Sequence, residues 1–158
     1  MLEKLAKLCA ILAGVLLTFI TIMTCVSLIG RNTTGWTIAG DFELTGVAAG
    51  AAVALFMPWC QMKQGNIIVD FFTSKASERT NALLDRFGAL MLAAMFAIVA
   101  WRTTIGTLNA YDTHSSTMMM GFPEWMVYAT MVPPFILTTL IALYQTFAGF
   151  ETTAEVHE

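Results

Sequence analysis

Charge is the scarcest feature of this chain. Of its 158 residues only 12% are charged, whereas 57% are hydrophobic, and the mean hydropathy is +0.69. A soluble domain carries about 25% charged residues, so too few are present here to cover a water-facing surface. Intrinsic disorder is excluded as well, because disordered chains combine low hydrophobicity with high charge. The composition is that of an integral membrane protein.

Residues that serve metal, redox or nucleic-acid chemistry are also few. The three cysteines, Cys9, Cys25 and Cys60, lie in apolar sequence and form no C-x-x-C pair, which argues against disulfides and zinc. His114 and His157 have no ligand partner at suitable spacing within a span, so neither haem nor a metal cofactor is expected. A net charge of −3 gives no basic patch for nucleic acid. Because the common hydrolase, phosphate-loop and metalloprotease motifs are missing too, we expect no enzyme activity.

Four apolar stretches predict an all-α integral membrane protein with one four-helix domain over residues 1–158. Crossing about 30 Å of hydrocarbon takes about 20 apolar residues. The predicted spans cover about residues 8–29, 44–62, 83–105 and 125–147. The first is too long for a signal peptide, so we expect it to be retained. Pro133 and Pro134 should kink or loosen the fourth span, and the tail 151–158 should be flexible.

The connection between the second and third spans has an amphipathic pattern. Ile67, Ile68, Phe71 and Phe72 share one face of a helix, with Lys75 turned away. Such a helix lies in the membrane interface, so we predict a short in-plane helix at about residues 67–75. The alternative is a loop that covers the helix ends or a partner.

Basic residues are unevenly distributed between the two sides of a four-span chain. One side has the N-terminal tail and the second loop, with Lys4, Lys7, Lys63, Lys75, Arg79 and Arg86. The other side has Arg31 and Arg102. Because cytoplasmic loops are the ones enriched in lysine and arginine, we expect both termini to be cytoplasmic.

Ionisable residues flank the predicted spans and none lies at the centre of one. Asp41 and Glu43 begin the second span, where the helix dipole stabilises acidic groups. Alternatively, Glu43 contacts Arg31 or docks a partner. Arg102 either reaches from the end of the third span to the interface or contacts a partner.

Small residues mark a packing face in the second span. Gly46, Gly50 and Ala54 recur every four residues, a spacing that lets helix backbones approach closely in lipid. The contact is either within this domain or with another subunit. The run Met118–Met120 offers adaptable apolar surface for binding.

A series of short motifs recurs in a fixed order between about Ser27 and Phe147. They are Gly30-Arg31, Trp36, Glu43-Leu44, Gly65-Asn66-Ile67-Ile68-Val69-Asp70, Ser116, Gly121-Phe122-Pro123-Glu124-Trp125, Tyr128 and Pro133. In these motifs and their order the chain resembles the DctQ-type small membrane subunit of tripartite ATP-independent periplasmic (TRAP) transporters. Two positions depart from the family pattern. Asn66 stands where a histidine is usual, and Asp41 is not adjacent to Glu43, where paired acidic residues are common.

The resemblance implies a role in a complex in the bacterial inner membrane. It implies a large multi-span transport subunit that holds the substrate and sodium sites, and a periplasmic binding protein that delivers an organic acid. The small subunit would brace the scaffold of the large one, surrounded by membrane lipids, and help to dock the binding protein. Arg31, Trp36, Glu43, Asp70, Pro123 and Trp125 match recurring family positions, which implies structural or interface roles.

Two other classes of protein remain as alternatives. A small homodimeric exporter would need an essential carboxylate in the middle of the membrane, for which Glu43 is the nearest candidate. A quinone-linked membrane oxidoreductase would need paired cysteines or haem histidines at the span ends.

Overall fold

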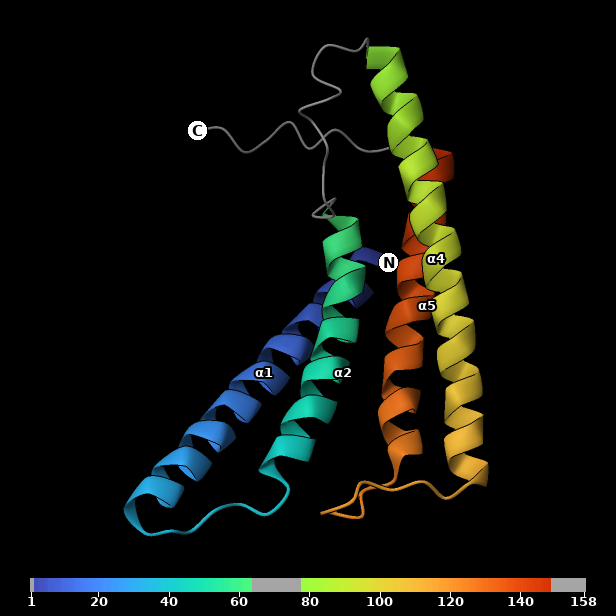
Figure 1. Cartoon of the computed structure of the whole chain (residues 1–158). Coiled ribbons are helices and arrows are strands. Elements are labelled where there is room, and N and C mark those ends of the chain that lie inside the picture. Colours follow the sequence, from blue (N-terminus) through green and yellow to red (C-terminus); the bar gives the residue numbers. More distant parts are fainter. Residues whose placement is uncertain (1, 64–77, 149–158) are drawn as a thin grey trace, which may run out of the picture.

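The structure, a computed structural model, describes residues 2–63 and 78–148, which form long helices joined by short loops, as Figure 1 shows. Its helices are α1 (Leu2–Thr33), α2 (Asp41–Met62), α4 (Glu78–Asp112) and α5 (Glu124–Ala148). Four helices are long and apolar enough to cross a membrane, which confirms the predicted all-α, four-span fold. The predicted in-plane helix at 67–75 and the tail at 151–158 lie outside the described residues.

The helices are longer than the spans expected from the sequence. The largest difference is in α4, which continues to Asp112, whereas the apolar pattern suggested an end near 105. Threonines in this region do not interrupt the helix because each hydroxyl bonds to a carbonyl one turn earlier; Thr103, Thr104 and Thr107 all do so at 2.8–2.9 Å. In α5 the helix continues through Pro133 and Pro134.

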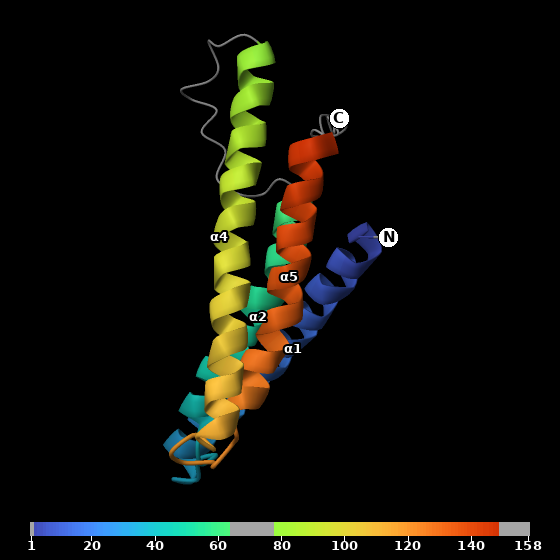
Figure 2. The same ribbon diagram turned by 90° about the vertical axis from the view of Figure 1, so that its right-hand side faces the viewer.

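The four helices stand in the spatial order α1, α2, α5, α4 (Figure 1). The pair α2 and α5 forms the middle, α1 packs on α2, and α4 packs on α5. Figure 2 shows that α1 is inclined to α4 and α5. The loops 34–40 and 113–123 lie together at one end, which we call the loop end. The outer helices α1 and α4 each leave a long apolar face uncovered.

Small side chains make the contacts of both outer helices. The buried residues of α1 are Ala6, Ala13, Ile20 and Ser27. Their seven-residue spacing keeps them on one narrow line along the helix. On α4 the buried alanines are Ala89, Ala93, Ala100 and Ala110. Small residues allow close backbone approach, which drives helix association where lipid is as apolar as the side chains.

The centre of the fold is the contact between α2 and α5. Helix α2 contributes four buried alanines, Ala48, Ala51, Ala52 and Ala54. Opposite them, α5 contributes Thr138, Ile141 and Ala142, each with no exposed surface. The hydroxyl of Thr138 bonds to the carbonyl of Pro134 at 2.8 Å, so this buried polar group is satisfied within its own helix.

Candidate functional site

Hydrogen bonds between buried and half-buried side chains join the first turn of α2 to α1. The hydroxyl of Ser27, which is 1% exposed, donates to the Asp41 carboxylate at 2.6 Å. One turn further along, the hydroxyls of Thr24 and Thr45 lie 3.4 Å apart. Because a short hydrogen bond to a carboxylate is stronger than one between neutral groups, Ser27 and Asp41 fix the loop end of α1 against α2.

Hydrogen bonds to Glu43 join the same turn of α2 to the loop between α4 and α5. The backbone N–H of Met119 donates to both carboxylate oxygens, at 3.0 and 3.1 Å, and that of Met120 donates at 3.3 Å. The Glu43 carboxylate is therefore bound by backbone N–H groups of the 113–123 loop. Among the described residues no ion pair joins Glu43 to Arg31, which is exposed in the last turn of α1.

Two glycines allow the chain to turn tightly around this site. Gly40 has φ +76°, a left-handed conformation, and a Cβ there would collide with the side chain of Met120. At Gly30 a Cβ would come within 2.7 Å of the Trp36 carbonyl oxygen and 3.2 Å of its ring. Trp36 thus folds back over the end of α1 while 59% of its surface stays exposed. Both positions need the missing side chain of glycine.

The 113–123 loop is held in shape by its own backbone. Ser116 pairs with Pro123 in an isolated antiparallel bridge, and Thr117 N–H donates to the Phe122 carbonyl at 2.9 Å. At the start of α5, the ring of Trp125 meets Tyr111 edge-on at 5.8 Å between centroids. Pro123 and Trp125 therefore close the loop onto the end of α4, and the loop presents its backbone N–H groups to Glu43.

At the opposite end, two buried glutamines join α2 to α5. The side-chain amide of Gln61 donates to the Gln145 side-chain oxygen at 2.8 Å. In return, Gln145 donates to the backbone carbonyl of Gln61 at 3.0 Å. Helix α2 ends one residue later, at Met62, so Gln145 contacts α2 in its last turn. The sequence analysis did not identify this pair; a polar residue inside each of two apolar spans was the available signal.

The small-residue face of α2 divides into parts with different surroundings. Ala54 is 1% exposed in the contact with α5. A Cβ on Gly50 would lie 2.9 Å from the terminal methyl of Met131 in α5. Gly46 is exposed, with nothing within 4 Å of where its Cβ would be. The packing face thus serves contact within the domain at Gly50 and Ala54 and leaves Gly46 open.

The remaining predicted site residues do not join this cluster. Arg102 is exposed on α4, well before the end of the helix at Asp112. Asp70 lies outside the described residues. In the described ranges no group of three or more histidine, cysteine or acidic residues could hold a metal ion.

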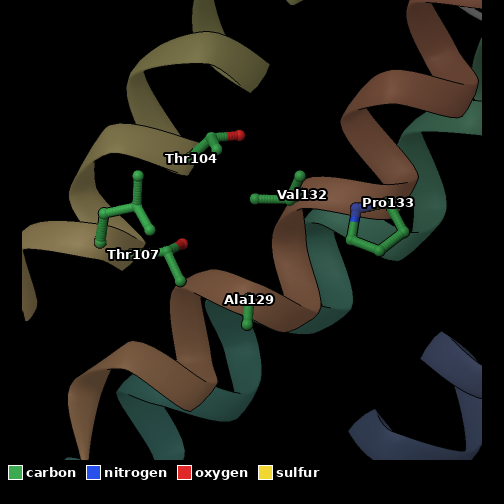
Figure 3. A pocket seen from close by; sticks show the side chains of 6 residues that line it. Thr104, Thr107, Ala129, Val132 and Pro133 are labelled. Atoms are coloured by element: carbon green, nitrogen blue, oxygen red, sulfur yellow. The ribbon is translucent and has the colours of Figure 1, made fainter. Parts of the chain in front are cut away.

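A groove of about 230 Å³ lies between α4 and α5 (Figure 3). It is lined by Thr104, Thr107, Leu108, Ala129, Val132 and Pro133. Both threonine hydroxyls already donate to carbonyls of their own helix, so the groove offers apolar surface and no hydroxyl proton to a ligand. Such a surface suits hydrocarbon and does not suit a charged organic acid.

Glu43 lies in the first turn of α2, with its oxygens bound by loop backbone. This differs from the mid-membrane carboxylate that an exporter would need. Cys9 and Cys25 are not joined in a disulfide.

Comparison with protein families gives one finding that agrees with this geometry. Residues 20–152 match the model for the DctQ component of tripartite ATP-independent periplasmic transporters. Comparisons with curated proteins and with solved structures gave no match. The family match covers the four helices from within α1 to the end of α5, together with the loops that carry Glu43, Pro123 and Trp125. The chain belongs to the DctQ-component family of TRAP transporters, and is a small membrane subunit of such a transporter.

Proposed function

We propose that this subunit braces the scaffold of a large, multi-span transport subunit that takes up an organic acid. The large subunit holds the substrate and sodium sites, and a periplasmic binding protein delivers the substrate. The assembly lies in the bacterial inner membrane, with both termini of this chain in the cytoplasm. The uneven distribution of lysine and arginine supports that orientation.

The observation that carries the bracing role is the set of polar contacts around α2. Helix α2 is joined to α1 through Asp41, to the 113–123 loop through Glu43, and to α5 through Gln61. These contacts lie at both ends of the helix and involve every other element of the described fold except α4, which packs on α5. A helix held at both ends favours a fixed support over a moving transport element.

The loop end supports a part in docking the binding protein. Met118 is 99% exposed and Met119 is 70% exposed, while the backbone of Met119 is fixed by Glu43. Methionine side chains adapt their shape to a partner. A fixed backbone that carries flexible apolar side chains is suited to brief contact with a soluble protein that must also leave.

The test is charge reversal at Glu43 in the complete transporter. In Glu43→Lys the two backbone N–H groups lose their acceptor and meet a cation. We expect less large subunit to co-purify in mild detergent and slower uptake, with an unchanged order of preference among substrates. Changed substrate selectivity would contradict a supporting role.

The matched control is Asp112→Lys, which reverses an exposed charge at the same end of the molecule. It removes no contact with α2, so co-purification and uptake should stay near those of the wild type. Glu43→Gln retains one acceptor oxygen and should fall between the wild type and Glu43→Lys. A wild-type chain that purifies only with itself would overturn the proposed function altogether.

A further inference from the structure

Arg102 is an exposed cation far from both ends of α4. About ten residues separate it from Asp112, which at 1.5 Å per residue is roughly 15 Å along the helix. In the other direction, Arg86 is about 16 residues or roughly 24 Å away. Between those two charges Arg102 is the only ionisable side chain of this helix apart from Tyr111.

The depth of Arg102 in a membrane follows from the shortest helix. Helix α2 has 22 residues, Asp41–Met62, and its length of about 33 Å barely exceeds the hydrocarbon core of a bilayer. To cross, α2 has to lie almost wholly within that core, with its middle near residue 52. The bilayer centre is therefore at the middle of α2.

Contacts between neighbouring helices show which part of α4 lies at the same depth as the middle of α2. Gly50 of α2 faces Met131 of α5, and Pro133 of α5 lines the same groove as Thr104 of α4, as Figure 3 shows. Arg102 is two residues from Thr104, in the direction away from the loop end. It therefore lies at about the level of the middle of α2, near the bilayer centre.

Arg102 also points away from the rest of the chain. Ala93 and Ala100, which are 2% and 7% exposed, mark the face of α4 that packs on α5. At about 100° per residue, Arg102 lies roughly 200° around the helix from Ala100. On that outer face it shares a line with Met91, Met95 and Ile98, which are 52–60% exposed.

No described carboxylate can neutralise Arg102. The acidic residues in the described ranges are at or near helix ends: Glu3, Asp41, Glu43, Glu78, Asp85, Asp112 and Glu124. A second copy of this chain would carry these described acidic groups at the same depths, away from Arg102. A phospholipid headgroup lies at the interface, more than a side-chain length away. An arginine at this depth without an anion costs about 2.5–3.5 kcal/mol even on insertion scales.

We propose that the outer face of α4, formed by Met91, Met95, Ile98 and Arg102, packs against a membrane helix of the large transport subunit that presents a carboxylate to Arg102. The apolar residues supply the packing surface, and the arginine fixes the depth and rotation of the partner helix. The inference rests on the proposed function, because it takes the large subunit as the partner.

The test compares Arg102→Leu with Arg86→Leu in the transporter co-expressed with its large subunit. Arg86 is an exposed arginine of the same helix, and at roughly 24 Å from the level of Arg102 it lies where water can solvate it. We expect Arg102→Leu to lower the large subunit recovered per small subunit at least tenfold, whereas Arg86→Leu leaves it near the wild-type ratio. A single cysteine at Ile98 should form a cross-link with the large subunit in the wild-type background.

A charge swap separates this contact from a folding defect. Arg102→Glu should lose the large subunit, and replacing the facing aspartate or glutamate of the large subunit by arginine should restore it. If Arg102→Leu recovers as much large subunit as the wild type does, this inference is overturned and the proposed function stands. The same conclusion follows if Arg102→Leu keeps the large subunit and loses only a bound phospholipid. If the wild type recovers no large subunit, the proposed function fails, and this inference with it.

Discussion

The Gln61–Gln145 pair gives a quantitative test of how α2 and α5 are held together. The two side chains are 3% and 6% exposed and share one side-chain hydrogen bond of 2.8 Å. A second bond, of 3.0 Å, runs from Gln145 to the backbone of Gln61 and survives replacement of the Gln61 side chain. The perturbation is therefore a double-mutant cycle with Gln61→Leu, Gln145→Leu and the double variant.

The expected coupling energy is that of the one bond between the side chains. Hydrogen bonds between membrane helices are worth about 0.6 kcal/mol on average and about 1.7 kcal/mol at most. Replacing an amide by an alkyl group also changes the transfer energy of each site, but this contribution cancels in the cycle. We expect a coupling of about 0.6 kcal/mol or somewhat more, because both groups are buried.

The measurement is unfolding of the purified chain by sodium dodecyl sulfate in mixed micelles, followed by the intrinsic fluorescence of its four tryptophans, of which Trp59 lies two residues from Gln61. Thr146→Val is the control, because the Thr146 hydroxyl bonds only to the carbonyl of Ala142 in its own helix. Thr146→Val should show no coupling to Gln61→Leu. A coupling of zero between Gln61→Leu and Gln145→Leu would refute the role assigned to the pair.

Two further predictions concern the loop end. Gly40→Ala should destabilise the chain by about 1–2 kcal/mol, because it forces a side chain into a left-handed conformation against Met120. In the same titration Gly46→Ala, which meets open space, should be neutral or stabilising by up to about 1 kcal/mol. In a variant without native cysteines, a membrane-impermeant maleimide should label His114→Cys on whole cells and Lys63→Cys only after permeabilisation. The opposite pattern would invert the orientation.

The four-helix architecture was predictable because the sequence contains long uncharged stretches. A long uncharged stretch has no alternative to a helix in lipid, where every backbone group needs an internal partner. Trp125 and Pro123 were also identifiable, since both stand in a recognisable order at the start of the last span. The place of Trp125 beside Tyr111 then follows from the short connection between α4 and α5.

Contacts between distant segments were not predictable from the sequence. The backbone of Met119 offers no sequence signal for binding Glu43, because any residue carries the same N–H group. Gln61 and Gln145 are 84 residues apart, and their meeting depends on the relative depth of two helices. Arg102 appeared at the end of a short span because the uncharged stretch stops at its charge. In the structure α4 continues past it, through Thr103 and Thr104, to Asp112.

The two outer helices differ in what can cover them. The exposed face of α1 has Leu8, Ile11, Val15, Phe19 and Ile22, with exposures of 56–63%, and no charge between Lys7 and Arg31. Lipid can cover such a face at no electrostatic cost. On α4 the equivalent face is interrupted at mid-depth by a cation, and lipid tails cannot solvate it. In the order α1, α2, α5, α4 these two helices are the outer ones (Figure 1). We therefore expect the protein partner at the α4 edge and lipid at the α1 edge.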